Sequence, residues 1–351
     1  MGNCHMFLVL LQFGILVVIG KPQVPCYFIF GDSLVDSGNN NNLATLAKAN
    51  YLPYGIDFPK GVTGRFTNGR TMADMIGEIL GFDEFIPSYA SVTNDGQMIR
   101  GVNYASGGAG IRCETGSHLG DRISLDRQLC NHKTVVSRLF SLHRNTTFTN
   151  EYLGKCIYVV NIGSNDYINN YLLPTIYTTS SKYTPQQYAA SLIQQYSNQL
   201  KNLYNLGGRK IVVFGLAKLG CAPAEISVFG TDGKRCVESI NDVVKYFNDN
   251  LKPLVDELNH HNHDAKFTFI NVSHISRLQK AVPFANIPCC EVGADWQCDH
   301  TTTTRHIRAL SVYYDGFHPT EFANNIIAVT SYFALSHMDA SPYDINHLVQ
   351  L

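Results

Sequence analysis

Five short runs of β-branched and aromatic residues recur along the chain. They span residues 26–30, 101–105, 156–162, 210–214 and 266–270. Runs of this length and composition predict β-strands, and most of them lack a polar residue at every second position. Strands that are apolar on both faces are typical of a parallel sheet covered by helices on each side. We therefore expect a buried, parallel, five-stranded sheet.

Helical spacing of apolar residues fills the segments between these runs. Thr184 and Pro185 predict the N-cap and first position of one helix. Its apolar face recurs at helical spacing, through Tyr188, Leu192, Tyr196 and Leu200. A second helix, with a kink expected at Pro253, has the face Ile240, Val244, Phe247, Leu251 and Leu254. A last helix is expected to begin near Thr320 and to bury Phe322, Ile326, Val329 and Phe333. Strands alternating with helices indicate the α/β class.

Polar loops follow three of the predicted strands directly. The strand 26–30 leads into Gly31-Asp32-Ser33, the strand 101–105 into the glycine-rich segment 106–110, and the strand 156–162 into 163–166. Asp315 and His318 lie three residues apart, just before the last predicted helix. Because loops at the carboxyl ends of parallel strands meet at one edge of the sheet, where ligands bind, we expect all four segments to lie together.

The residue types in these loops suit nucleophilic catalysis. A serine hydroxyl needs a base to remove its proton and a third group to orient that base, roles that Ser33, His318 and Asp315 can fill. Backbone N–H groups near Ser33 and Gly108, with the Asn165 amide, are candidate donors to an oxyanion. Each feature alone is common in turns and helix caps. Their occurrence together in this order predicts a Ser-His-Asp hydrolase.

The chain lacks the sequence motifs of two other enzyme classes, the α/β-hydrolases and the dinucleotide-binding enzymes. The nucleophile elbow of α/β-hydrolases requires Gly-x-Ser-x-Gly in mid-chain, and the chain has no such segment. A dinucleotide-binding loop requires Gly-x-Gly-x-x-Gly, but Cys113 stands where the third glycine after Gly108 and Gly110 belongs.

Several charged and polar residues near these motifs have simpler structural interpretations. The histidines at 260, 261 and 263 read as part of a solvated loop rather than a metal site. Arg65 and Arg70 flank a glycine-rich segment; they could hold substrate, but an ion pair that pins the loop is favoured. Asp32 and Asp166 are expected to accept hydrogen bonds from nearby turn backbone.

Composition narrows the range of partners. The chain has 351 residues, of which 45% are hydrophobic and 16% charged, and a net charge of −1. Nucleic-acid binding needs a concentrated basic surface, so a nucleic-acid partner is not expected. No linker, repeat or charge run divides the chain, which favours one domain over 21–351 with helical insertions. The oligomeric state is left open.

Residues 1–20 resemble a secretory signal peptide. Their apolar run from Met6 to Ile19 is too short to span a membrane comfortably, and Gly20 suits signal-peptidase cleavage. The second interpretation is a lipid anchor at Met1-Gly2-Asn3-Cys4, although Met6 occupies the position where myristoylation prefers Ser or Thr. We expect a secreted protein without an integral membrane segment in its mature chain, located in the apoplast or cell wall if its source is a plant.

Cysteines and sequons agree with an extracellular compartment. Loss of Cys4 with the signal would leave nine cysteines, which suggests disulfides plus one unpaired thiol. Spacing favours Cys221 with Cys236, and less strongly Cys113 with Cys130 and Cys298 with either Cys289 or Cys290. Asn145 and Asn271 each begin an Asn-x-Ser/Thr sequon and are candidate glycosylation sites if they lie at the surface. None of the cysteines has the spacing of a zinc site.

The segment 30–40, Phe-Gly-Asp-Ser-Leu-Val-Asp-Ser-Gly-Asn-Asn, resembles the opening motif of plant GDSL esterase/lipases, members of the SGNH hydrolase superfamily. Segments 64–70, 103–110, 163–166 and 315–319 resemble further motifs of that family in the same order, over nearly the full chain. The resemblance implies a three-layer α/β/α fold with a flavodoxin-like sheet and Ser33 as nucleophile. It also implies Asp315 as orienter, His318 as base, and Gly108 and Asn165 as oxyanion donors, with Gly107 competing for the glycine role.

The function expected from these observations is hydrolysis of carboxylic esters without a cofactor or metal. The substrate is expected to be a lipid, a small ester or an acylated glycan. Two alternatives stay open: removal or transfer of acetyl groups on a cell-wall polysaccharide or other glycan, and a binding protein that kept the fold and lost turnover.

Overall fold

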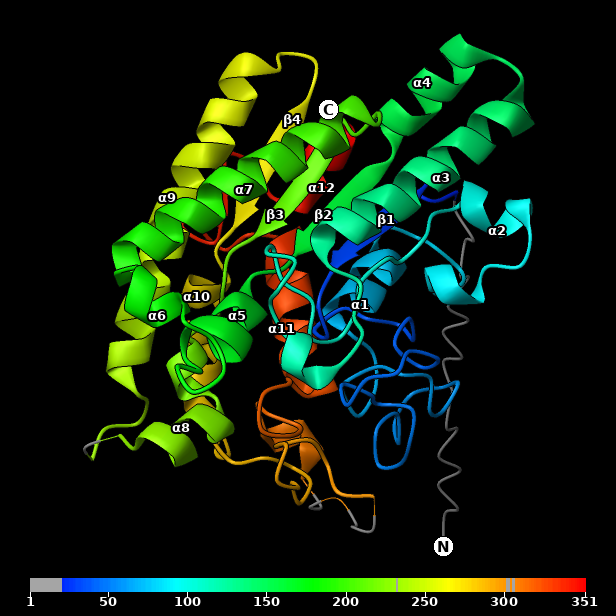
Figure 1. The fold of residues 1–351 in the computed structure, drawn as a ribbon. Helices are drawn as coiled ribbons and strands as arrows, with labels where there is room; N and C mark the ends of the chain where they lie inside the picture. The colour runs from blue at the N-terminus through cyan, green and yellow to red at the C-terminus, as the bar shows by residue number, and fades with distance from the viewer. Residues whose placement is uncertain (1–20, 232, 301–303, 305–306) are drawn as a thin grey trace, which may run out of the picture.

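The computed structural model describes residues 21–231, 233–300, 304 and 307–351, so the predicted signal segment 1–20 lies outside the described residues (Figure 1). Five strands form one sheet in the order β1-β2-β3-β4-β5. Four of them run parallel, and β5 pairs antiparallel with β4. The strands are β1 Tyr27–Gly31, β2 Ile157–Asn161, β3 Lys210–Phe214, β4 Lys266–Ile270 and β5 Ala340–Ser341. The predicted α/β class with a five-stranded sheet is confirmed, and the sheet is mostly parallel where a wholly parallel one was predicted.

One predicted strand forms only isolated bridges with the sheet, and one strand was missed. Residues 101–105 run parallel to β1 along its outer edge, with Asn103 opposite Ile29, but they form isolated bridges and not a continuous strand. Backbone hydrogen bonds still join the segment to β1: the Ile29 N–H donates to the Val102 carbonyl at 3.1 Å and the Tyr104 N–H to the Ile29 carbonyl at 2.7 Å. The Asn103 side chain also accepts the Ala105 N–H and donates to the Val35 carbonyl. The fifth strand is β5, whose two residues are too few to give a periodic signal in the sequence.

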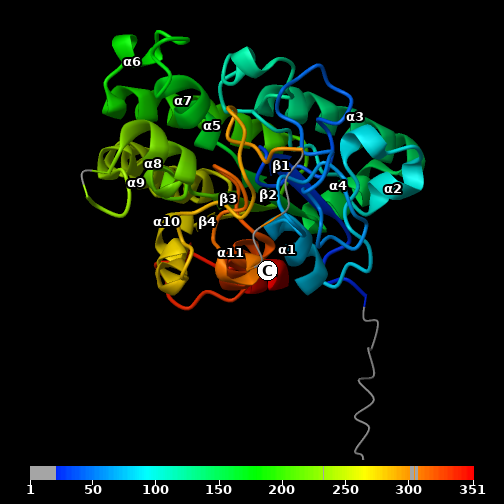
Figure 2. The ribbon, with the colours of Figure 1, turned by 90° about the horizontal axis from the view of Figure 1, so that it is seen from below.

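Helices cover both faces of the sheet and give three layers (Figures 1 and 2). Alternate strand residues face opposite layers: Phe28 packs with one hydrophobic cluster and Ile29 with the other. The first layer contains α3 Leu125–His143, α4 Thr146–Lys155, α7 Pro185–Asn205 and α9 Glu238–His261. The second contains α1 Met72–Ile79, α11 Glu321–Tyr332 and α12 Ile345–Gln350. The expectation that the strands are buried on both faces is therefore correct.

Short helices lie in the connections between the main elements. They are α2 Asp95–Ile99, α5 Ser164–Asp166, α6 Thr179–Lys182, α8 Pro223–Phe229 and α10 Val272–Ile275. The helices α5, α8 and α10 gather at the carboxyl end of the strands, the lower end of the sheet in Figure 1. This end also receives the loops that follow β1 and precede α11.

Two of the predicted helices are confirmed. Thr184 caps α7 in a capping box with Gln187, and Pro185 is its first residue. The helix α9 continues through Pro253 and extends to His261. His260 and His261 therefore belong to the last turn of a helix, and their assignment to a loop was wrong.

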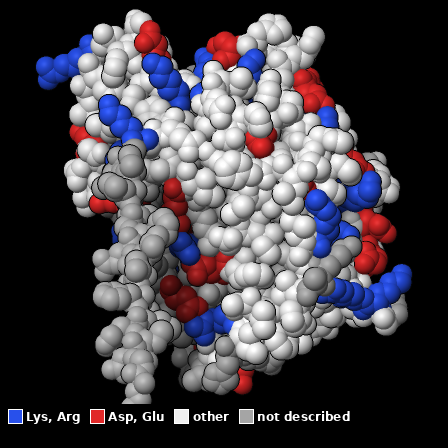
Figure 3. All heavy atoms as spheres, turned by 180° about the vertical axis from the view of Figure 1, so that it is seen from behind, with Lys and Arg blue, Asp and Glu red and all other residues white. Residues whose placement is uncertain are grey.

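The predicted core face of the last helix is correct only for Ile326, which packs against the core. Thr320 caps α11 as expected, but Phe322, Val329 and Phe333 are 37%, 42% and 53% exposed. Small residues are buried instead: Ala328 lies in the cluster that contains the α1 side chains, and Ala323 packs with Val282 and Val312. The large apolar side chains of Phe322, Val329 and Phe333 are therefore exposed. The face of the molecule seen in Figure 3 carries few charged side chains at its centre.

The described residues contain three disulfides, of which two were predicted. Cys221 pairs with Cys236, Cys298 pairs with Cys290, and Cys26 pairs with Cys156 across the start of β1 and β2. The suggested pair of Cys113 and Cys130 does not form: both are free, exposed thiols, so the expectation of a single unpaired thiol is wrong. The pair across the strands was missed because 130 residues separate its cysteines.

The two candidate glycosylation sites differ in exposure. Asn145 is exposed and caps α4 through its side-chain oxygen, which leaves its amide nitrogen toward solvent. Asn271 is half-buried and caps α10. Among the described residues, no helix is long and apolar enough to cross a membrane.

Candidate active site

Ser33, His318 and Asp315 form a continuous hydrogen-bonded chain at the carboxyl end of the sheet. The Ser33 Oγ lies 2.8 Å from His318 Nε2, and the His318 Nδ1 lies 2.7 Å from Asp315 Oδ2. Ser33 follows β1, whereas Asp315 and His318 precede α11. His318 lies 285 positions after Ser33 in the sequence. Asp315 is fully buried and His318 is 7% exposed, so the polar chain reaches the surface only at the serine. The fold thus brings the three predicted residues together.

The turn after β1 places Ser33 at this edge. Gly31 ends the strand where an added Cβ would lie 2.4 Å from the Asn161 carbonyl oxygen, so only glycine fits. The Asp32 carbonyl then accepts the N–H groups of Val35 and Asp36, which bends the chain into a helical turn and leaves the serine at its start. A strand ending in glycine followed by this turn projects Ser33 away from the sheet.

Asp315 fixes the orientation and tautomer of His318. Its Oδ1 accepts the backbone N–H of Phe317 at 2.8 Å and of His318 at 2.7 Å, which ties the carboxylate to its own turn. A carboxylate can only accept, so His318 Nδ1 carries the proton that points to Asp315. The other nitrogen, Nε2, then accepts the Ser33 hydroxyl and can take its proton.

Three N–H donors face the space in front of Ser33. The backbone N–H groups of Ser33 and Gly108 donate to no other group within the described part of the chain, and both residues line the same cavity with Asn165. The N–H of Gly107, by contrast, already donates to Asp36 Oδ2 at 3.1 Å. This difference favours Gly108 over Gly107 as the oxyanion donor.

Neighbouring groups hold the Asn165 amide in one orientation. Its oxygen accepts the side-chain N–H of Asn169 at 2.6 Å, and one amide hydrogen donates to the Ala109 carbonyl at 2.9 Å. The second amide hydrogen remains for a ligand in the cavity. The side chain therefore links the glycine-rich loop to α5 and still presents a donor.

Asp166 joins the two loops that supply these donors. Its carboxylate accepts the N–H groups of Ile111 at 2.8 Å and Arg112 at 3.1 Å, and the Thr115 hydroxyl at 2.7 Å. Asp166 thus bonds nearby turn backbone, as expected, although the donors lie 51 to 55 positions away in the sequence. Burial raises the pKa of Asp166 to about 6 despite these hydrogen bonds.

Asp32 lies beside the nucleophile and has a strongly perturbed carboxyl group. As expected, its Oδ1 accepts a backbone N–H of its own turn, from Leu34 at 3.0 Å. Its Oδ2 is buried and has no hydrogen-bond partner within the described residues. Burial raises the pKa of Asp32 to about 7, and the nearby Asp166 charge adds to the shift while the Leu34 N–H and His318 oppose it. Protonation of Asp32 lowers the charge next to the site.

A cavity of about 160 Å³ opens in front of Ser33. Its walls are mainly apolar, and the polar groups among them converge on the serine. The apolar lining includes Leu34, Phe66, Leu119, Ile168, Leu219 and Phe317. An apolar pocket with a few converging polar groups is the usual form of a small-molecule site.

The two arginines and the histidine cluster do not contribute to this site. Arg65 is buried and makes a bidentate ion pair with Asp74, and Arg70 pairs with Glu321 at 2.6 Å, as the structural interpretation expects. The described residues contain no group of three or more His, Cys, Asp or Glu side chains that could hold a metal ion.

Three contributors were missed by the sequence analysis. Tyr54 donates to Asp315 Oδ2 at 2.5 Å, Asp36 holds the Gly107 N–H, and Asn40 donates to the Gly107 carbonyl at 2.9 Å. Asp36 and Asn40 stand inside the 30–40 motif, which was the available signal. Tyr54 lies in a loop without periodicity, so only the fold reveals its contact.

An α/β fold with a Ser-His-Asp chain at the carboxyl edge of its sheet is the arrangement of a serine hydrolase. The family model described as GDSL-like Lipase/Acylhydrolase matches residues 27–329. The chain is 48% identical to the GDSL esterase/lipase At1g29670 of Arabidopsis thaliana, over 98% of this chain and 97% of that protein. It is 45% identical to the GDSL esterase/lipase At4g18970 of the same plant, over 95% of each. The chain belongs to the GDSL lipase/acylhydrolase family, whose members are hydrolases acting on ester bonds.

Proposed function

We propose that this protein is a secreted serine esterase or lipase in which Ser33 attacks the ester carbonyl and His318 takes and returns the proton. Asp315 keeps the imidazole in the required tautomer and stabilises its protonated form. The N–H groups of Ser33 and Gly108 and the Asn165 amide stabilise the oxyanion. Water then releases the acyl group from Ser33, and no cofactor takes part. The observation that carries the proposal is the unbroken Ser33–His318–Asp315 chain opening into a cavity with unused donors.

The cavity favours an apolar acyl group larger than acetyl. Its volume of about 160 Å³ is close to the roughly 150 Å³ of apolar protein cavities that hold one benzene molecule, which has six carbons. An acetyl group would leave most of the apolar wall uncovered. Each additional methylene buried contributes about 0.8 kcal/mol, or about fourfold in kcat/KM. This comparison ranks acyl esters of about four to six carbons above acetylated glycans.

A serine-directed phosphonate probe tests the nucleophile and separates an enzyme from a binding protein. The wild-type protein should be labelled at Ser33, and the Ser33→Ala variant should not. An absence of labelling in the folded wild-type protein would favour the binding protein.

Hydrolysis of p-nitrophenyl acetate, butyrate, hexanoate and dodecanoate, with acetylated xylan alongside, tests the acyl preference. We expect kcat/KM to rise from acetate to hexanoate. A maximum at acetate, or activity confined to the xylan, would favour the deacetylase alternative.

A further inference from the structure

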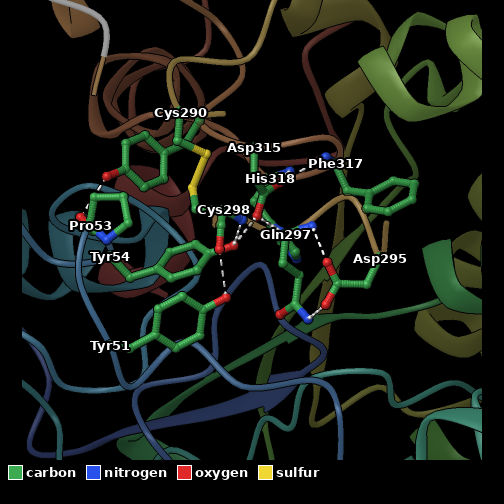
Figure 4. The surroundings of a disulfide bond; sticks show 11 residues. Tyr51, Pro53, Tyr54, Cys290, Asp295, Gln297, Cys298, Asp315, Phe317 and His318 are labelled. Carbon is green, nitrogen blue, oxygen red and sulfur yellow. Dashed lines mark hydrogen bonds and ion pairs between the residues drawn. A yellow bond between two sulfur atoms is a disulfide. The ribbon is translucent and has the colours of Figure 1, made fainter. Parts of the chain in front are cut away.

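A disulfide-closed loop packs directly against the segment that carries Asp315. Cys290 and Cys298 close this loop, and both cysteines are buried (Figure 4). At one side of the loop, the Cys290 N–H donates to the Tyr314 carbonyl at 3.1 Å. At the other side, the Gly316 N–H donates to the Trp296 carbonyl at 2.9 Å. The loop therefore holds the residues immediately before and after Asp315.

The approach between the loop and the catalytic segment is close. Trp296 has a φ of 63°, a left-handed conformation that residues other than glycine rarely adopt. An added Cβ on Gly316 would lie 2.6 Å from the Trp296 Cβ, so a side chain at this position would push the two segments apart. The glycine between Asp315 and Phe317 thus permits the contact.

Tyr54 connects this loop to the Asp315 carboxylate itself. Its hydroxyl donates to Asp315 Oδ2 at 2.5 Å and accepts the Cys298 N–H at 3.1 Å (Figure 4). Because the Cys298 N–H occupies an acceptor position of the Tyr54 oxygen, the phenolic hydrogen is directed to Asp315. Tyr54 is fully buried, and its ring packs against the rings of Phe66 and Tyr314.

This contact differs in origin from the other contacts of the carboxylate. Phe317 and His318 bond Asp315 from within the same turn, so they move with it. Among the described side-chain contacts of Asp315, Tyr54 is the one that comes from a distant part of the chain, 261 positions away. It shares Oδ2 with His318 Nδ1, so it fixes the direction in which that oxygen faces the imidazole.

We infer that Tyr54 is a positioning residue for the triad and that the Cys290–Cys298 disulfide holds Tyr54 in place. The inference rests on the proposed function, because it assigns Asp315 as the orienter of His318. Tyr54 touches neither Ser33 nor the cavity in front of it. It acts through Asp315, by holding one carboxylate oxygen toward the imidazole and by sharing that oxygen's charge.

The Tyr54→Phe variant tests the inference, with Tyr314→Phe as the matched control. Tyr314 has the same chemistry in the same aromatic cluster, but its hydroxyl donates to the Pro53 carbonyl at 2.5 Å. Hydrogen bonds to charged groups correspond to roughly 10-fold to 100-fold in an equilibrium or rate constant. We therefore expect Tyr54→Phe to lower kcat for p-nitrophenyl butyrate by roughly 10-fold or more, with little change in KM.

The pH profile separates positioning from a general loss of structure. Without Tyr54 donating to it, the carboxylate stabilises the protonated imidazole of His318 more strongly. The acid limb of kcat/KM should therefore move to higher pH in Tyr54→Phe and stay in place in Tyr314→Phe. A wild-type kcat and acid limb in Tyr54→Phe would overturn the inference, and so would an equal loss in both variants. Phosphonate labelling separates failure of this inference from failure of the proposed nucleophile. Labelling of Ser33 in Tyr54→Phe that is slowed in proportion to kcat supports the inference, and labelling at the wild-type rate contradicts it. An unlabelled wild-type protein contradicts the proposed nucleophile instead.

The disulfide is tested by the double variant Cys290→Ala/Cys298→Ala. We expect it to reproduce the kinetic effect of Tyr54→Phe, and the triple variant with Tyr54→Phe to be hardly worse, because all three changes act on one contact. The control is Cys26→Ala/Cys156→Ala, which removes the disulfide at the opposite end of the strands and should lower Tm without changing kcat of the folded protein. Two results would contradict the role of this disulfide. One is a loss of kcat in the triple variant equal to the product of the separate losses. The other is an equal loss of kcat in Cys290→Ala/Cys298→Ala and Cys26→Ala/Cys156→Ala.

Discussion

The buried carboxyl group of Asp32 should make the stability of this protein fall as pH rises. Burial raises the pKa of Asp32 to about 7, from an ordinary value of 3.8. Between these two pH values the folded protein keeps a proton that the unfolded chain has lost, so each rise in pH favours unfolding. The contribution is absent below about pH 4 and complete above about pH 7. At 1.36 kcal/mol for each pKa unit, it lowers the free energy of unfolding by on the order of 4 kcal/mol.

The substitution Asp32→Asn removes this titration and retains the side-chain shape. Its carbonyl oxygen can still accept the Leu34 N–H, the contact that Asp32 Oδ1 makes at 3.0 Å. We expect the variant and the wild type to have similar unfolding free energies near pH 4, and the variant to be more stable by up to about 4 kcal/mol at pH 8. Urea unfolding followed by tryptophan fluorescence, at half-unit steps from pH 4.5 to 8, measures this difference.

Asp57 offers a control in which the pH dependence of stability has the opposite sign. Hydrogen bonding to Arg308 lowers the pKa of Asp57, so its carboxylate stabilises the fold above the pKa of the unfolded chain and that contribution is lost on acidification. Asp57→Asn should therefore be less stable than wild type at pH 8, with a difference that shrinks toward pH 4. Parallel stability curves for Asp32→Asn and wild type from pH 4.5 to 8 would refute the reasoning about Asp32.

Three further predictions follow from the site and from the N-terminal segment. Ser33→Ala and His318→Ala should each remove nearly all turnover without unfolding, and the double variant should be hardly worse than either one, whereas independent losses would contradict proton transfer between them. Asn165→Ala should lower kcat by roughly 100-fold to 1,000-fold with little change in KM or Tm; a lower Tm with an unchanged kcat would mean that the amide is structural. The mature secreted protein should begin near Lys21, which N-terminal sequencing can check, and a retained, acylated Gly2 or Cys4 would contradict it.

Much of the site could be predicted because its parts carry local signals. A strand that ends in Gly31-Asp32-Ser33 and a pair Asp315 and His318 before a helix are visible as short motifs. Parallel topology then requires the loops at the carboxyl ends of the strands to meet. The order of apolar runs and capped helices gave the α/β class for the same reason, since periodicity and caps act over a few residues.

What the sequence left undecided depends on contacts between distant segments. The apolar residues of α11 suggested a buried face through Phe322 and Val329, but Ala328 faces the α1 cluster and Ala323 faces Val282 and Val312. The choice between Gly107 and Gly108 depends on Asp36, whose carboxylate crosses to another loop and takes up the Gly107 N–H.

The support of the triad by Tyr54 shows the same division most clearly. The sequence by itself determined that a serine, a histidine and an aspartate with suitable chemistry stand in the right order, because each belongs to a short motif beside a regular element. Only the tertiary structure decided that Tyr54 donates to Asp315 across 261 positions and that the Cys290–Cys298 loop directs this hydrogen bond. The contact of Tyr54 with Asp315 and its contact with the Cys290–Cys298 loop follow no sequence period, so no local pattern encodes them. The segments that carry these residues meet only when the whole sheet has formed.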